Sequence, residues 1–342
     1  MGIRHWVFGM FFIAPNSKYL IPILGITIIN PSQNFFTAFF VINETTTQKM
    51  NYRMQENKEI KALFNLIDDP DTEVFSIISD RIMNYGNSII PNLENLWENT
   101  ESNDVQNRIE TLIHKLQYHE LQNDLTEWST NTYNDLLFGA LLVAKYQYPD
   151  LHTTPILQDL DRIKRNIWLE LNNYLTPLEQ ANVLCSILYN YYQLSGNEVT
   201  YENPNDFFIN KVLESKRGNA ISMGILYQVM CDLLDINASI ISIPKQMIIA
   251  FYHTDYYADK CTEDAREKIH FYVDAVNGQA YSYADIHKYF KRINTIPTAE
   301  HFKPLSHKRT IQILLEEVGK CFYKSNSPDK IEEVTALVKI LG

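Results

Sequence analysis

The sequence predicts an α+β fold that is mostly helical, in which a buried helix packs on a small antiparallel sheet. Apolar residues recur at helical spacing through most of the chain from Lys58 onward. The run from Ala220 to Leu234 is apolar on nearly every side, as in a buried helix, and Asn219 is placed to cap its N-terminus. Strand-like runs rich in Ile, Phe, Tyr and Val follow it, at residues 239–243, 247–252 and 271–273. Asn277-Gly278 then signals a hairpin, so the strands are expected to pair antiparallel.

Helical segments precede and follow this region. An Asp-led apolar pattern begins near Asp71 and again near Asp104, about thirty residues on, and this spacing is similar to that of HEAT repeats. The last segment reads as two helices separated at residues 325–329, and it is similar to one tetratricopeptide unit. The predicted domains are therefore HEAT-like helices at 54–126, an α+β domain at 127–305 and a helical hairpin at 306–342. A single repeat unit cannot bury its apolar face alone, so both flanks are expected to dock on the central domain.

Composition excludes several classes of partner and site. The formal net charge of −11 repels nucleic acid phosphates and anionic membrane surfaces, so neither is an expected partner. The four cysteines lie far apart in the sequence and include no C-x-x-C pair, which argues against disulfides and against a structural zinc site. The sequence thus predicts a cytoplasmic protein with reduced thiols and no metal or other cofactor.

The first fifty residues differ in character from the rest. Residues 19–42 carry no charge, yet Pro22, Pro31 and the polar run 30–34 interrupt the apolar stretch that a membrane span needs. Three interpretations stay open: a translated upstream extension, a membrane or export segment, and a structured part of the protein. We expect residues 1–53 to be an extension outside the fold, with membrane anchoring through residues 1–45 as the alternative.

A resemblance to the SirB-type branch of the transglutaminase-like superfamily covers about residues 127–305. It rests on several stretches in the right order: 144–151, 208–214, 217–222, 226–227, Leu234, Pro244 and 273–278. Arg217, Gly218, Asn219 and Pro244 are motif positions within it. The resemblance implies a transglutaminase-like core, in which a buried helix packs on an antiparallel sheet.

Active relatives of this superfamily use a Cys-His-Asp triad, and the resemblance maps its positions to Ser222, Gln246 and Asp274. A serine hydroxyl is a poor nucleophile without a base, and glutamine does not accept a proton near neutral pH. The sequence therefore predicts a relic site without thiol-type acyl transfer. If the mapping holds, the three side chains converge in space.

Other residues do not restore the chemistry. Cys231 falls in the body of the buried helix, where a small apolar core residue is expected. His270 and Asp274 are four strand residues apart, so their Cα atoms are separated by about 13 Å. The polar insertion that contains His253, Asp255, Asp259, Cys261 and Glu263 matches no standard metal-ligand spacing.

The leading hypothesis is therefore a non-catalytic protein that acts as an interaction or regulatory module, with a protein or peptide partner. The alternative is a serine-dependent hydrolase or amidase with an unusual base. A third class, a membrane-tethered envelope protein, depends on the first fifty residues alone.

A chain that starts at Met54 is expected to be soluble and to unfold cooperatively with nearly the same Tm as the full chain. If Phe35, Phe36, Phe39 and Phe40 were core residues, each would contribute about 1.5–3 kcal/mol through burial, and their loss would be severe. Thermal unfolding of the two chains, followed by circular dichroism, measures the difference. Aggregation or a large fall in Tm would place the N-terminal stretch in the core or in a membrane.

Overall fold

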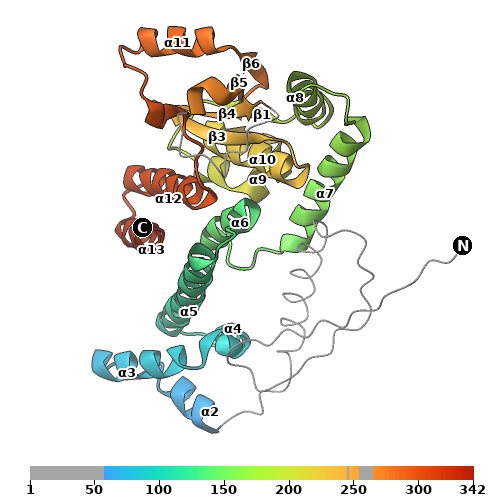
Figure 1. Ribbon diagram of the computed structural model, residues 1–342. Coiled ribbons are helices and arrows are strands. Elements are labelled where there is room, and N and C mark those ends of the chain that lie inside the picture. The colour runs from blue at the N-terminus through green and yellow to red at the C-terminus, as the bar shows by residue number, and fades with distance from the viewer. Residues whose placement is uncertain (1–57, 245, 254–264) are drawn as a thin grey trace, which may run out of the picture. The chain divides into compact units, whose positions relative to one another are not determined.

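The computed structural model describes residues 58–244, 246–253 and 265–342. The predicted extension at 1–53 and most of the polar insertion after His253 lie outside the described residues. The chain separates into two compact units, residues 1–65 and 66–342. The first contributes helix α2 (Lys58–Asn65), and the second contains the other elements of the described residues (Figure 1).

Helices form the N-terminal part of the second unit: α3 (Thr72–Met83), a 3-10 turn η1 (Gly86–Ile89), α4 (Ile90–Glu98) and the long α5 (Asn103–Thr130). Asp71 caps α3 by accepting a bond from the Glu73 backbone N–H, as expected for an Asp-led helix. Both α3 and α4 contact α5. Because α5 is continuous, the boundary expected between residues 126 and 127 falls inside a helix.

The sheet has four antiparallel strands in the order β3-β4-β5-β6, so the predicted α+β fold is confirmed. The strands are β3 (Ala238–Ile243), β4 (Gln246–Tyr252), β5 (Ile269–Asp274) and β6 (Gln279–Tyr281). Gly278, at φ 74°, takes the left-handed position in the β5–β6 turn that the Asn-Gly signal predicted. A short parallel pair of β1 (Ser195–Asn197) and β2 (Arg217–Asn219) is additional to the predicted strands.

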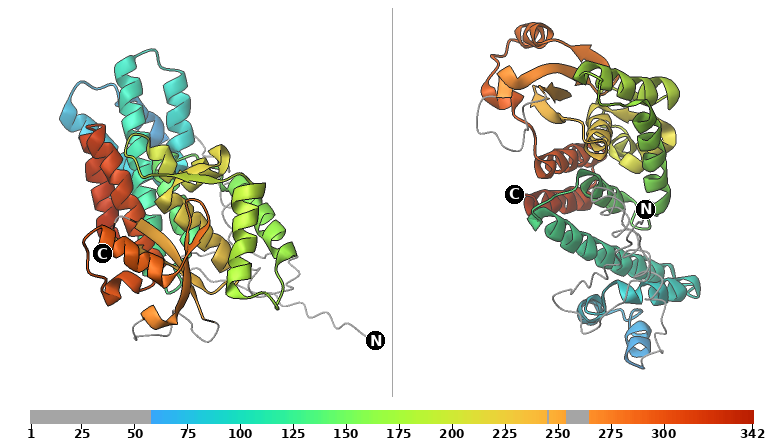
Figure 2. Two further views of the ribbon diagram at one scale, coloured as in Figure 1. Left: turned by 90° about the horizontal axis from the view of Figure 1, so that it is seen from above. Right: turned by 45° about the vertical axis from the view of Figure 1, so that its right-hand side comes forward.

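Helix α10 (Ala220–Leu233) lies at the centre of this unit. It contacts β3 and β4 on one side and α6 (Leu136–Gln147) and α12 (His307–Lys324) on others (Figures 1 and 2). Eleven consecutive residues, Ile221 to Cys231, are buried. The all-round apolar pattern of the sequence thus corresponds to a helix enclosed by several elements.

The two faces of the sheet meet different partners. One face carries Ile241, Ile248 and Tyr272, which pack with Ile286 of α11 (Tyr283–Arg292) and Phe302 of η6 (Ala299–Phe302). The other face meets α10, where the Tyr227 and Phe251 rings form an edge contact with centroids 6.3 Å apart. Strand alternation therefore decides which side chains of β4 and β5 can approach α10.

The remaining helices surround this core. They are α7 (Thr153–Glu170), α8 (Pro177–Cys185) continued by a π-helical turn η2 (Ser186–Tyr191), the 3-10 turns η3 (Pro204–Phe207) and η5 (Ala265–Lys268), α9 (Ile209–Ser215) and α13 (Pro328–Ile340). In the described ranges, no helix combines the length and the apolar character needed to cross a membrane.

The C-terminal helices α12 and α13 dock on α5 and α6. Glu333 of α13 accepts a bond from the Tyr146 hydroxyl at 2.9 Å and pairs with His114 Nε2 at 2.6 Å. The bond to Glu333 is the main cause that raises the pKa of His114. Polar bonds between side chains far apart in sequence thus fix the position of the hairpin on the helices that precede it.

His307, the first residue of α12, joins three segments. Its Nδ1 lies 2.7 Å from the Asn134 carbonyl oxygen, and its Nε2 lies 3.3 Å from Asp232 Oδ2 on α10. Burial lowers the pKa of His307, but the bond and charge of Asp232, with the Asn134 carbonyl and the charge of Asp135, outweigh burial and raise it overall. The protonated ring can donate from both nitrogens, so the folded state favours it.

Replacement of His307 by Gln should therefore destabilise the protein more in acid than in alkali. A raised pKa in the folded state gives stability that is present below the unfolded value of about 6.5 and lost as the pH rises through the folded value. Urea unfolding of both proteins at pH 5.5 and 9 should show a difference of about 1 kcal/mol that shrinks at the higher pH. The exposed control His119→Gln should have little effect, and a pH-independent loss in His307→Gln would contradict the assignment.

Candidate functional site

The N-terminus of α10 is where the resemblance places the nucleophile. Asn219 caps the helix: its Oδ1 accepts bonds from the N–H groups of Ile221 at 2.9 Å and Ser222 at 3.1 Å. Ser222 Oγ in turn accepts a bond from the Asn219 N–H at 3.0 Å. These reciprocal bonds form a capping box, which satisfies N–H groups that cannot reach water.

The Ser222 hydroxyl hydrogen has a partner of its own. Oγ donates to the backbone carbonyl oxygen of Asp206, in η3, at 2.6 Å. The side chain is buried, with an exposed fraction of 2% for the residue. Since a hydroxyl has one hydrogen, this bond commits the proton that a general base would have to remove. Ser222 therefore links the buried helix to η3.

The packing around Ser222 leaves no space for a side chain at Gly218. A Cβ atom at this position would lie 2.6 Å from Ser222 Oγ and 3.0 Å from a methyl carbon of Val212. The motif glycine therefore allows β2 to pass close to the helix N-terminus. Its neighbour Arg217 is exposed, and the Arg217 carbonyl accepts a bond from the Ser215 hydroxyl at 3.1 Å.

Gln246 and Asp274 lie on neighbouring strands and share one sheet face. Gln246 pairs with Ile243, and Asp274 follows Val273, which pairs with Ile249. Alternation places both side chains on the face that carries Ile243 and Ile248, which packs against α11 and η6. Met247 points the other way: its Sδ would lie 3.4 Å from a Cβ at Gly224 of α10.

The surroundings of the two strand residues do not include a bond to Ser222. Asp274 Oδ1 accepts a bond from the Val276 N–H at 2.9 Å, which closes a turn. Burial raises the pKa of the Asp274 carboxyl. Gln246 is exposed. The carbonyl of Pro244, two positions earlier, accepts a bond from the Tyr289 hydroxyl at 2.6 Å. The structure brings Gln246 and Asp274 to one face of the sheet. Ser222 is bonded to Asn219 and Asp206 and to neither of these two residues. The convergence of all three side chains in a single relic site stays a prediction.

The other candidate residues that the sequence offered, Cys231 and His270, are packed against neighbouring groups. Cys231 is fully buried in α10, and burial raises the pKa of its thiol well above the usual range. The His270 ring stacks on that of His253, with centroids 4.8 Å apart. The insertion residues Asp255, Asp259, Cys261 and Glu263 lie outside the described residues.

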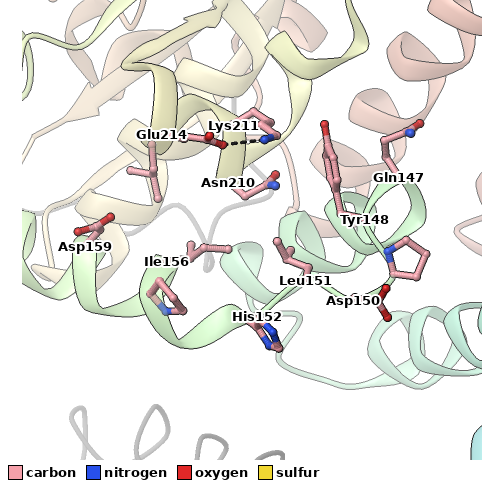
Figure 3. A pocket seen from close by; sticks show the side chains of 13 residues that line it. Gln147, Tyr148, Asp150, Leu151, His152, Ile156, Asp159, Asn210, Lys211 and Glu214 are labelled. Atoms are coloured by element: carbon pink, nitrogen blue, oxygen red, sulfur yellow. Dashed lines mark hydrogen bonds and ion pairs between the residues drawn. The ribbon is translucent and has the colours of Figure 1, made fainter. Parts of the chain in front are cut away.

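Two features of the site were not anticipated from the sequence. The Asp206 carbonyl contact is invisible to side-chain motifs, because any residue at that position supplies a carbonyl. The stretches 144–151 and 208–214, which carried part of the resemblance, meet around a cavity of about 640 Å³ (Figure 3). Both stretches carry the family resemblance, and this shared feature could have indicated that they lie close together in space.

Residues 154–316 match the model of a protein family described as the transglutaminase-like superfamily. The matched span runs from α7 into α12 and contains α10 and the whole sheet. This part of the chain is therefore a transglutaminase-like superfamily domain. No curated protein and no solved structure matches the chain.

Ser222→Ala should lower the free energy of unfolding by about 1–3 kcal/mol, because the Asp206 carbonyl and the Asn219 N–H lose a buried partner. Urea unfolding measures the change. The matched control Ser242→Ala, at an exposed position of β3, should stay within about 0.5 kcal/mol of the parent. Equal effects of the two substitutions would contradict a capping role for Ser222.

Proposed function

We propose that the chain is a non-catalytic transglutaminase-like protein that acts as an interaction or regulatory module. The observation that carries this proposal is the bonding of Ser222, the residue that the resemblance maps to the family's nucleophile. Its hydroxyl accepts from the Asn219 N–H and donates to the Asp206 carbonyl. Both bonds serve the helix and the segment packed on it.

The chemistry supports the same conclusion. Acyl transfer by a serine needs a group that takes the hydroxyl proton, and an amide carbonyl does not accept a proton near neutral pH. The part of the chain that the structure describes offers Ser222 no bond to a histidine or carboxylate side chain. A missing general base alone slows such a reaction by about 10² to 10⁴.

The role in binding rests on different features. The domain has an open cavity beside α9, at the place where two stretches of the family resemblance meet. The chain's net charge of −11 disfavours nucleic acid, and a protein or peptide is the partner class that we propose. A cytoplasmic location, argued from the four scattered cysteines, belongs to the same proposal.

The folded full chain should not react at Ser222 with a fluorophosphonate probe, because its hydroxyl is buried and lacks a base. Labelling is read by in-gel fluorescence and located by peptide mass spectrometry, with an active serine hydrolase in the same tube as the positive control. Ser222→Ala is the matched variant and should give the same background signal. Labelling of Ser222 in the parent, absent from the variant, would instead establish the serine-dependent hydrolase or amidase.

A further inference from the structure

Two exposed histidine side chains lie side by side at one end of the sheet. His253 directly follows β4 and His270 belongs to β5, and their rings stack with centroids 4.8 Å apart and planes 25° from parallel. In the sequence they stand on either side of the polar insertion, so ligand spacing along the chain did not indicate this pair. Imidazole nitrogen is the protein ligand that divalent transition metals meet most often.

A β-bulge in β5 brings His270 to this position. Phe251 pairs with Phe271, but the next residue of β4 pairs with Ile269, so β5 has one extra residue, His270, between the two pairs. Without a bulge, strand alternation would place Ile269 and Phe271 on the same face. Instead Ile269 packs toward α11, while Phe271 stacks on Phe251, which contacts α10. The bulge thus changes the direction in which the side chain beside His253 points.

The backbone around the pair is held in place. The His253 N–H donates to the Lys268 carbonyl oxygen at 3.0 Å, and the His253 carbonyl oxygen accepts from Asn237 Nδ2 at 3.3 Å. The His270 ring makes an edge contact with the Phe271 ring, with centroids 5.5 Å apart. Two ligands on a fixed backbone are organised before an ion arrives, which lowers the cost of binding it.

The ring nitrogens of the pair are available to a ligand. Both residues are exposed, and no hydrogen bond joins either ring to the part of the chain that the structure describes. A neutral imidazole has one nitrogen lone pair to give to a metal ion. The two side chains can therefore act as ligands without breaking an existing bond to a described residue.

The separation of the rings suits one shared ion. With metal–nitrogen bonds of about 2.0–2.1 Å and tetrahedral geometry, the centres of two imidazole ligands lie about 5 Å apart. The 4.8 Å between the rings of His253 and His270 matches this value. Rotation about χ2, which is a soft torsion in histidine, turns the nitrogens toward a common point and leaves each ring centre near its place.

We infer that His253 and His270 bind one divalent transition-metal ion, of the class to which Zn²⁺ belongs. The inference goes beyond the proposed interaction function and does not depend on it. Within the described ranges, no group of three or more His, Cys, Asp or Glu side chains could hold an ion. The pair therefore supplies two imidazole ligands, and water completes the coordination. Imidazole favours Zn²⁺ over Mg²⁺, which prefers oxygen ligands.

Isothermal titration of the full chain with Zn²⁺ alone, at neutral pH and in a buffer that does not bind the ion, tests the inference. The parent should show one saturable site that both histidines contribute to. Mg²⁺ should show no saturable heat, because the proposed ligands are nitrogens. Each of His253→Gln and His270→Gln should weaken Zn²⁺ binding by about tenfold or more, since loss even of a residue that only supports a metal ligand costs about 10- to 100-fold.

The double variant decides whether the two histidines share one ion. If they do, the second substitution adds little to the first, because the shared site is already lost; two independent sites would instead give effects that multiply. His119→Gln is the matched control, because His119 is an exposed histidine on α5, and it should leave the affinity unchanged. Thermal unfolding shows whether each variant is folded, and His253→Gln, outside the strands, serves if His270→Gln is not.

Four results would overturn the inference. They are no saturable Zn²⁺ binding by the parent, parent-like affinity in both single variants, multiplying effects in the double variant, and equal binding of Mg²⁺ and Zn²⁺. The proposed function fails on a separate observation, the labelling of Ser222. A chain with an unreactive Ser222 and no Zn²⁺ site at the histidine pair therefore refutes the metal inference alone.

Discussion

The burial of α10 is the constraint on which the rest of the domain depends. A helix enclosed on all sides must satisfy its first N–H groups inside the protein, since water cannot reach them. Asn219 and Ser222 do so through reciprocal bonds, and Ser222 adds a bond to the Asp206 carbonyl. Those bonds hold η3, β2 and the start of α10 together, and they leave no room for a side chain at Gly218.

The same constraint shapes the chemistry of the site. In active relatives, the start of the buried helix favours a thiolate through its dipole and free N–H groups. The resemblance maps Ser222 to that position, and here the Ser222 hydroxyl takes part in the cap, accepting one hydrogen bond and donating another. Sheet alternation adds to the difference, because Gln246 points to the α11 face while Met247 meets α10. The bonds of Ser222 are thus part of the hydrogen bonding that supports the core.

The outer helices are joined to this core by a few long-range polar bonds. His307 connects α12 to α10 and to the turn before α6, and Glu333 connects α13 to α5 and α6. The apolar faces of these helices supply most of the burial, whereas the polar pairs select one arrangement of the helices. The cavity beside α9 is lined by the loop between α6 and α7 and by the first turns of α7.

The sequence by itself determined the elements whose signals are local. Period and composition identified α10 and the strands of the sheet, and the side chains of Asn219 and Asp71 marked where helices begin. The Asn-Gly pair placed the last hairpin, because its geometry depends on two residues. Family resemblance added the order of the motifs, and that order assigned Ser222 to the position of the nucleophile.

Tertiary structure alone decided the features that depend on contacts between distant segments. The partner of the Ser222 hydroxyl is a carbonyl sixteen positions earlier in the chain, and any residue type could have supplied it. The face on which Gln246 and Asp274 lie follows from strand register, which a one-residue shift would reverse. The parallel pairing of β1 with β2 and the cavity between α7 and α9 arise where separate segments meet. Local propensity contains no information about such meetings, because they are set by how the whole core packs.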